Sequence, residues 1–214
     1  MSAAALLLGL GLGLGTDGGT PTGCSVGPDA QWQVVDGKMQ TNYYRLGQED
    51  GRTTLHADYP AGAKTVTLGR RLKDGSCNGN TLAWSWRVHR FPTGSDERLS
   101  AKADSAVAVY ATFGSMLHRQ SLKYVWSSVL PTGTVVGRKK SMLFDVVTLV
   151  LEGPGPVDVW KRETVNAAAD WARYFGNGKT TAQAPPLVAL GVLTDGDQTH
   201  TTPSADYADF TLAP

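Results

Sequence analysis

The stretch Leu82-Ala83-Trp84-Ser85-Trp86-Arg87-Val88 indicates the class of fold most clearly. Large apolar side chains occupy every second position, which is the period of a β-strand with one covered face. Leucine and valine share that face with Trp84 and Trp86, so we expect the face to lie in a core. The alternative is an outward face, on which the two indoles would form a platform for sugar rings. Arg87 lies on the opposite face, where its planar fork suits a carboxylate or an acidic sugar.

Similar segments recur along the chain and are separated by turn-forming residues. They span 32–35, 53–58, 64–68, 105–113, 122–129, 142–151 and 187–193. One helix is expected over 164–176, with Thr164 as its cap, apolar residues at helical spacing from Val165 to Phe175, and Gly176 as its left-handed end. About ten strands without alternating helices predict an all-β, single-domain antiparallel sandwich of the jelly-roll type with one short helix.

The composition narrows the class of protein. The 214 residues suit one domain, and only 18% of them are charged, against roughly 25% in an average soluble domain. Twenty basic residues against nineteen acidic ones give a net charge of +1, which argues against nucleic acid as the main partner. With 41% hydrophobic residues and 25 glycines, the chain has the composition of an exported β-protein.

The N-terminal region indicates export. Residues 3–15 have the length and apolarity of a signal-peptide core and are too short to span a membrane, although no positive residue precedes them. We therefore expect a leader and linker over 1–23, or else a flexible segment without a function, and a sandwich domain over 24–214. No other segment has the length of a transmembrane helix. The protein is predicted to be periplasmic or secreted.

The two cysteines, Cys24 and Cys77, allow two alternatives. In an oxidising compartment they would form a bridge that ties the N-terminal segment to the domain, which is the alternative we favour. The end of Pro21-Thr22-Gly23-Cys24 resembles a lipoprotein processing box, apart from its proline, and a lipid on Cys24 would leave Cys77 free.

No metalloenzyme motif is present. The sequence contains no His-Glu-x-x-His and no clustered Cys/His set. Its four histidines lie far apart along the chain, and we expect each to be a surface or packing residue. They are His56, His89, His118 and His200.

An ordered series of motifs carries a family resemblance. It consists of Trp84-Ser-Trp86-Arg87-Val88, Asp104 leading into Val109-Tyr110-Ala-Thr-Phe113, Tyr124-Val-Trp126-Ser127, Thr194-Asp195-Gly-Asp197-Gln198-Thr199 and Tyr207-Ala-Asp209. This series resembles a bacterial family of domains of unknown function, number 3047, over about residues 30–210. The chain departs from the family pattern at Gln198 and His200, where the family usually has Asn and Gly. The resemblance implies an exported β-sandwich similar to galactose-binding-like jelly rolls and carbohydrate-binding modules, and it implies no particular activity.

Polar and aromatic side chains around these motifs predict a ligand site. We expect a concave sheet face that binds a glycan or another cell-envelope ligand without catalysis, formed by Arg87, Lys102, Asp104, Tyr124 and Trp126. For Tyr124 and Trp126 the alternative is burial in the core. For Lys102 and Asp104 it is a solvated loop with one structural salt bridge.

A second set of residues predicts a structural calcium ion. Asp195, Asp197, Thr199 and Asp209 offer the hard oxygen ligands that calcium takes. The alternative for Asp195-Gly196-Asp197 is an ordinary β-turn.

Two further functions remain open beside the binding module. A polysaccharide hydrolase would need two carboxyl groups at a defined separation, for which Asp104 and Asp209 are the candidates. A lyase would use Tyr124 or a histidine as base, with Arg87 neutralising the acid of the substrate. A purely structural envelope protein is the third outcome. Binding is favoured because no motif supports catalysis.

Overall fold

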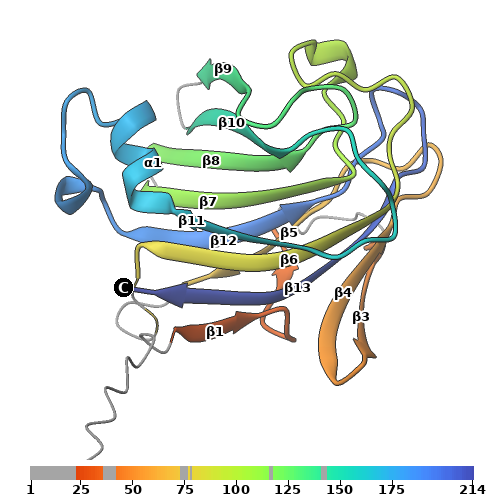
Figure 1. Ribbon diagram of the computed structural model, residues 1–214, viewed down its shortest axis with the longest axis horizontal. Coiled ribbons are helices and arrows are strands. Elements are labelled where there is room, and N and C mark those ends of the chain that lie inside the picture. Colours follow the sequence, from red (N-terminus) through yellow and green to blue (C-terminus); the bar gives the residue numbers. More distant parts are fainter. Residues whose placement is uncertain (1–22, 36–41, 73–76, 78, 116–117, 141–143) are drawn as a thin grey trace, which may run out of the picture.

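The computed structural model describes residues 23–35, 42–72, 77, 79–115, 118–140 and 144–214. In this part of the chain two β-sheets pack face to face, with one α-helix at an end of the sandwich (Figure 1). Sheet A has the order β11 (Lys161–Asn166), β6 (Thr81–Arg90), β13 (Ser204–Ala213), β4 (Arg52–Asp58) and β3 (Tyr44–Glu49), and β1 (Cys24–Gly27) also pairs with β13. Sheet B has the order β2 (Gln33–Val34), β5 (Thr67–Arg71), β12 (Leu187–Leu193), β7 (Val107–Ser115), β8 (His118–Trp126), β10 (Phe144–Glu152) and β9 (Val135–Lys140). The predicted β-sandwich with one short helix is confirmed.

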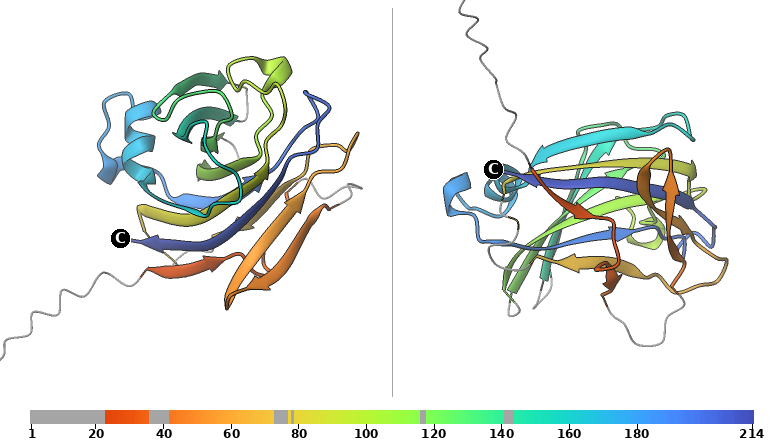
Figure 2. Two further views of the ribbon diagram at one scale, coloured as in Figure 1. Left: turned by 45° about the vertical axis from the view of Figure 1, so that its right-hand side comes forward. Right: turned by 90° about the horizontal axis from the view of Figure 1, so that it is seen from below.

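The strand pairing departs from the expected pattern in one place. The β8–β10 pair is parallel, and the other pairs described are antiparallel. Figure 2 shows that sheet B curves strongly toward its β9 edge, whereas β6 and β13 run side by side along sheet A. Two short 3-10 turns, η1 (Ser100–Lys102) and η2 (Thr181–Gln183), lie in the connections.

The face that carries Trp84 and Trp86 is the core face of sheet A, as its alternation predicts. Both indoles are fully buried. Across the sandwich, Trp84 contacts Tyr124 at 5.5 Å between ring centroids, and Trp86 contacts Trp126 at 6.5 Å. Aromatic pairs at this separation add to the free energy gained from burying apolar area. The alternative of an exposed tryptophan platform on this strand is therefore wrong.

The helix is shorter than the sequence predicts. Helix α1 spans Ala167–Tyr174, and Asn166 caps it by accepting a hydrogen bond from the backbone N–H of Ala169 at 2.9 Å. Thr164 and the residues around it belong instead to β11, because their backbone pairs with β6 as far as Asn166. Gly176 has no left-handed φ; a Cβ there would collide with the carbonyl of Ala172, so close approach requires the glycine.

Strand β13 was missed by strand periodicity, although it lies at the centre of sheet A. Its inward residues, such as Ala205 and Tyr207, alternate with Asp206, but Asp209 adopts a left-handed φ of 57° at a bulge. The bulge and two aspartates make the segment look like a loop. Strands β1, β3, β9 and β11 were also not anticipated.

The N-terminal part is tied to the domain by a disulfide. Cys24 of β1 is bonded to Cys77, with 5.9 Å between their Cα atoms. A sulfur in a disulfide cannot also carry a thioether-linked lipid, so the lipoprotein alternative at Cys24 is incompatible with this structure. The leader expected over 1–23 lies, except for Gly23, outside the described residues. Among the helices described, none is long and apolar enough to cross a membrane.

Candidate functional site

The outer face of sheet A carries a connected set of polar side chains centred on Asp206. This residue lies on the central strand β13, opposite His56 of β4 and Arg87 of β6. Its side chain is only 5% exposed although it points away from the core. Its Oδ1 lies 2.7 Å from His56 Nδ1, and its Oδ2 lies 2.7 Å from His89 Nε2 and 2.9 Å from Arg87 Nε. Three side chains therefore converge on one buried carboxylate.

These partners decide the charge of Asp206. Burial by itself would raise the pKa of this carboxyl, but hydrogen bonds from His56, Arg87 and His89 outweigh it and lower the pKa. Arg87 also donates to Glu49, at 3.1 Å from Nη1 to Oε1 and 2.7 Å from Nη2 to Oε2. The guanidinium thus bridges two carboxylates, which fixes its orientation.

Trp160 lies beside this cluster. Five of the six tryptophans are buried, and Trp160 is the one that is partly exposed. The guanidinium carbons of Arg52 and Arg87 lie over its ring, 4.8 and 4.6 Å from the centroid. Asp209 holds Arg52 at 3.3 Å and accepts a 2.8 Å hydrogen bond from the hydroxyl of Ser85.

We call this set the outer network, and its members are Glu49, Arg52, His56, Arg87, His89, Asp158, Trp160, Asp206 and Asp209. Four carboxylates stand against two arginines, so the network carries a net charge of −2 when its histidines are neutral. Its members come from four strands of sheet A, which are β3, β4, β6 and β13, and from the segment before β11.

The five predicted ligand residues do not form one groove. Arg87 belongs to the outer network, whereas Tyr124 and Trp126 are buried in the core because their positions on β8 alternate inward. Lys102 is exposed on η1, and Asp104 is fully buried beside the 195–199 loop. The expectation of a shared groove is wrong, since Arg87 points outward from one sheet and Tyr124 points inward from the other.

Three of the four predicted metal ligands, Asp195, Asp197 and Thr199, gather around Asp104, which was expected in the ligand groove instead. Carboxylate oxygens of Asp104, Asp195 and Asp197 lie within 4.8 Å of one another. Asp104 accepts 2.6 Å hydrogen bonds from both the backbone N–H and the hydroxyl of Thr199. Asp209 lies in the outer network instead, because the bulge in β13 turns it toward Ser85. We call Asp104, Asp195, Asp197 and Thr199 the acidic loop cluster.

Burial dominates the electrostatics of the acidic loop cluster. It raises the pKa of Asp195 to about 7, partly opposed by the nearby Lys123 and by a 2.9 Å hydrogen bond from the backbone N–H of Ser105. Asp104 and Asp197 raise this pKa further. Lys123 is itself buried, and its carboxylate and tyrosine neighbours keep its pKa raised.

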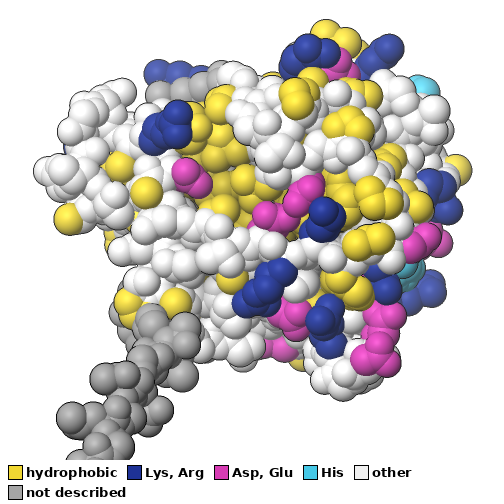
Figure 3. Space-filling view, in the orientation of Figure 1, with side chains coloured by type: hydrophobic (Ala, Val, Ile, Leu, Met, Phe, Trp, Pro, Cys, Tyr) yellow, Lys and Arg dark blue, Asp and Glu magenta, His cyan; other side chains and the backbone are white. Residues whose placement is uncertain are grey.

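A carboxylate pair links the two sheets, with Glu163 on β11 and Glu152 at the end of β10. Figure 3 shows, on the face in view, a hollow with hydrophobic side chains that acidic and basic ones border. Glu163 accepts a 3.2 Å hydrogen bond from the indole N–H of Trp86, and Lys161 lies 3.7 Å from Glu152. Burial and the neighbouring Glu152, which is in hydrogen-bond contact, raise the pKa of Glu163.

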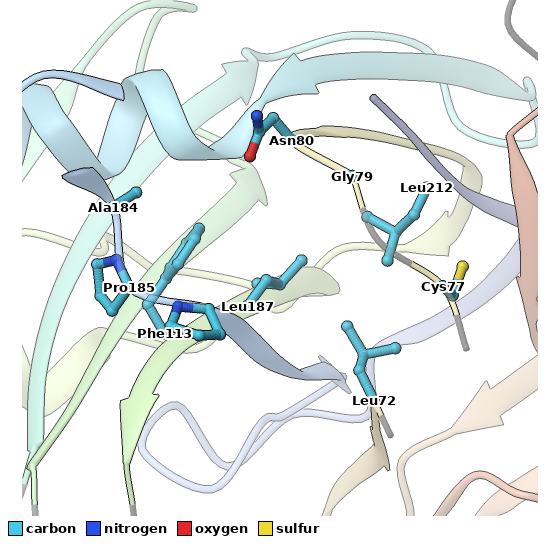
Figure 4. A pocket seen from close by; sticks show the side chains of 10 residues that line it. Leu72, Cys77, Gly79, Asn80, Phe113, Ala184, Pro185, Leu187 and Leu212 are labelled. Atoms are coloured by element: carbon cyan, nitrogen blue, oxygen red, sulfur yellow. The ribbon is translucent and has the colours of Figure 1, made fainter. Parts of the chain in front are cut away.

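A separate cavity of about 230 Å³ lies at the end of the sandwich near the disulfide. Apolar side chains such as Leu72, Phe113, Leu187 and Leu212 line it, and Asn80 is the polar side chain at its rim (Figure 4). Ligand pockets are usually larger, at about 300–1,000 Å³, and contain several convergent polar groups. We do not place the functional site here.

Sequence reasoning missed most of the outer network. His56 and His89, expected to be isolated, approach each other to 5.8 Å between ring centroids. A signal was present for His89, which shares the outward face of its strand with Arg87 two residues earlier. No local signal pointed to Glu49 or Trp160, because pairing between distant strands brings them to the network.

Comparison with known proteins identifies the family. The model of the family described as "Protein of unknown function (DUF3047)" matches residues 30–211. The chain belongs to this family. The recognised series of motifs therefore reflects membership, and the family description names no activity.

No curated protein matches the chain. Among solved structures, the xyloglucanase domain of NopAA from Sinorhizobium fredii, in complex with cellobiose, is 13% identical with a TM-score of 0.44, covering 86% of this chain and 93% of that one. The family 12 endoglucanase 3 of Trichoderma harzianum is 11% identical, with a TM-score of 0.44 and coverages of 80% and 82%. The family 12 xyloglucanase of Bacillus licheniformis is 7% identical, with a TM-score of 0.43 and coverages of 79% and 85%. At these values we draw no conclusion about activity from the likeness.

Proposed function

We propose that this protein is an exported, non-catalytic binding module for a neutral glycan or a similar hydroxyl-rich ligand of the cell envelope. The outer network is the proposed binding surface. The observation that carries the proposal is the buried carboxylate of Asp206, which organises His56, His89 and Arg87 on a sheet face that is otherwise open. The disulfide between Cys24 and Cys77 supports export, because such bonds persist in oxidising compartments.

The charge of the outer network selects among ligands. Arg87 is already bridged between Glu49 and Asp206, so it has no free fork for an acidic sugar. Four carboxylates against two arginines would also repel a polyanion. Hydroxyl groups, in contrast, can both donate to these carboxylates and accept from the arginines and histidines. A neutral polyhydroxylated ligand therefore fits better than the acidic one suggested by Arg87 alone.

The network is also pre-organised. Its arginines are held by carboxylates and lie over the ring of Trp160, so little side-chain entropy remains to be lost when a ligand binds. Trp160 adds a partly exposed aromatic surface, on which the C–H groups of a sugar can pack. Fixed polar groups beside one aromatic ring are a suitable arrangement for an exposed glycan site.

The carboxylate pair first considered for hydrolysis does not favour that reaction. Asp104 is fully buried with its oxygens bonded to the 195–199 loop, and Asp209 belongs to the outer network. Tyr124, considered as a lyase base, is buried in the core. These placements support binding over catalysis by those residues.

One observation favours hydrolysis as a second candidate function. Burial and the neighbouring Glu152 raise the pKa of Glu163, which is the property of a general acid. Retaining hydrolysis needs carboxyl groups about 5–5.5 Å apart, whereas these two are in hydrogen-bond contact. If this carboxylate pair is catalytic, Glu163→Gln abolishes the release of reducing ends from a polysaccharide, and Trp160→Ala leaves that release unchanged.

We also propose that the acidic loop cluster holds a structural calcium ion. Its donors are carboxylate and hydroxyl oxygens, which suit calcium, with Asp104 in the place first expected for Asp209. Such an ion would tie the 195–199 loop to the start of β7.

A glycan array probed with the full chain tests the binding module, followed by calorimetry with the best neutral oligosaccharide. We expect Trp160→Ala and Arg52→Ala to weaken binding at least tenfold. Arg98→Ala is the matched control, because Arg98 is exposed and pairs with Asp96, which is not a member of the outer network. Melting temperatures identify variants that fail to fold. Equal affinity in all three variants would show that the outer network is not the binding surface. An array without any bound glycan would support a structural role in the envelope instead.

A further inference from the structure

We infer that the outer network contains a binding site for one divalent transition-metal ion of the zinc class, held by His56, His89 and Asp206. This inference does not rest on glycan binding, because metal affinity is measured on the protein alone. No sequence motif indicates the site, because the three residues lie on three different strands.

The three donor groups already face one point. Asp206 lies on the central strand, His56 is its register partner on β4, and His89 lies on the other neighbour, β6. One ligand atom from each residue can be chosen such that all three lie within 4.8 Å of one another. Because the donors stand on paired strands, the backbone holds the site without a loop having to close.

The observed distances are near those of a metal complex. Zinc–ligand bonds of about 2.0–2.1 Å place the donors of a tetrahedral ion about 3.3 Å apart. Asp206 lies 2.7 Å from each histidine nitrogen, so each contact would have to open by about 0.6 Å. The imidazole centroids are 5.8 Å apart, close to the roughly 5 Å expected for two histidines on one ion.

Asp158 gives a second reason for the inference. It lies 2.5 Å from His89 Nδ1, so that the other ring nitrogen, Nε2, faces Asp206. A carboxylate on the far nitrogen of a histidine is the usual outer partner of a metal-bound imidazole, because it fixes the ring and increases its basicity.

The local charge favours a dication. The carboxylates of Glu49, Asp158 and Asp206 surround the site, and Arg87 is the cation in direct contact with it. Arg87 hydrogen-bonds Asp206 through Oδ2, which His89 also contacts, and Oδ1 faces His56. A divalent ion would bring the net charge of the outer network from −2 to zero.

The donor set and the exposure indicate the class of ion. Two imidazoles and one carboxylate suit zinc and similar transition metals, whereas calcium and magnesium take oxygen ligands only. The side chains of His56 and His89 are 42% and 28% exposed. A fourth coordination position would therefore face solvent and accept water or an oxygen atom of an external ligand.

Metal binding is tested on the full chain without a histidine tag. After dialysis against a chelator, the protein is titrated with Zn²⁺ in competition with a chromophoric chelator, and with Co²⁺ while visible absorption is recorded. We expect one ion per chain and the d–d bands of a four- or five-coordinate Co²⁺ complex. His56→Gln and His89→Gln should each weaken zinc binding at least tenfold, and Asp158→Asn should weaken it about tenfold through the orientation of His89.

His118→Gln is the matched control, since His118 is exposed on β8 of the other sheet and should leave zinc affinity unchanged. Circular dichroism confirms that each variant is folded. If a histidine variant does not fold, the zinc affinity of Asp158→Asn and the Co²⁺ spectrum of the wild type still test the metal site. Zinc binding that survives the His56→Gln/His89→Gln double substitution, or no saturable binding at all, overturns the inference whether or not a glycan binds.

Discussion

Asp206 in the outer network and Asp195 in the acidic loop cluster are both buried, yet their charges are controlled in opposite ways. Three side chains donate to Asp206 and lower its pKa. At Asp195 burial dominates and raises the pKa to about 7, with one backbone hydrogen bond to oppose it and two aspartates that add to it. Hydrogen-bond donors therefore outweigh burial at Asp206, whereas too few donors surround Asp195 to do so. The outer network provides its own cation in Arg87, whereas the acidic loop cluster has only Lys123 nearby.

The largest effect is expected from removing that cation. Arg87→Ala leaves the buried Asp206 and its neighbour Glu49 without their shared partner, which should cost about 3–5 kcal/mol of unfolding free energy. Glu49→Gln is the control, because Glu49 is 41% exposed and its loss should cost less than about 1 kcal/mol. Urea denaturation measures both. Equal costs would mean that Asp206 does not depend on Arg87.

The second prediction concerns the pH dependence set by Asp195. Its pKa rises from 3.8 to about 7 on folding, so the folded chain holds a proton that the unfolded chain releases. The wild type should therefore lose stability as the pH rises from about 4 to 7, by at most about 1.4 kcal/mol per pH unit from this group. Asp195→Asn lacks this dependence on pH, so its unfolding free energy should increase relative to that of the wild type between about pH 4 and 7. Denaturation in the presence of a chelator checks it, and parallel profiles would contradict it.

Calcium should change the acidic loop cluster and leave the outer network unaffected. At ten times its dissociation constant, a bound ion adds about 1.4 kcal/mol to the unfolding free energy. We expect the wild type to melt at a higher temperature in calcium, and Asp197→Asn to lose this shift. Glu49→Gln, altered in the other region, should retain it. A shift of equal size in all three proteins would place the ion elsewhere.

The smallest effect is expected for Thr199→Val. The change removes the hydroxyl that donates to Asp104 at 2.6 Å but keeps the backbone N–H that donates to the same oxygen. A lost hydrogen bond to a charged, buried group should cost about 1–2 kcal/mol. Thr93→Val, on an exposed turn, should cost less. If Thr199→Val is neutral, the hydroxyl does not pin the 195–199 loop.

Local periodicity predicted the sandwich and the core well, because strand alternation is a property of neighbouring residues. Trp84 and Trp86 fall in the core for the reason given by Leu82 and Val88 beside them. It failed at Thr164, where cross-strand pairing with β6 overrides a helical pattern. It also failed at β13, where a bulge interrupts the alternation.

The candidate site was much less accessible from the sequence. The predicted set contained Arg87 but separated it from His56 and Asp206, which lie 150 residues apart and meet only through strand pairing. Tyr124 and Trp126 were ambiguous because an alternating strand does not reveal which of its faces is covered. Asp195 and Asp197 were found because they are close in sequence, and Asp104 joined them through the fold.

The position of β13 in sheet A has a consequence for how the protein is made. The strand lies between β6 and β4 and also pairs with β1, all of which precede it in the chain. Until residues 204–213 have left the ribosome, those three strands lack the backbone that joins them, and the outer network lacks Asp206. Such long-range pairing is formed late and slowly. Sheet A and the outer network should thus be completed only after β13 has been made, whereas the strands of sheet B can pair before it.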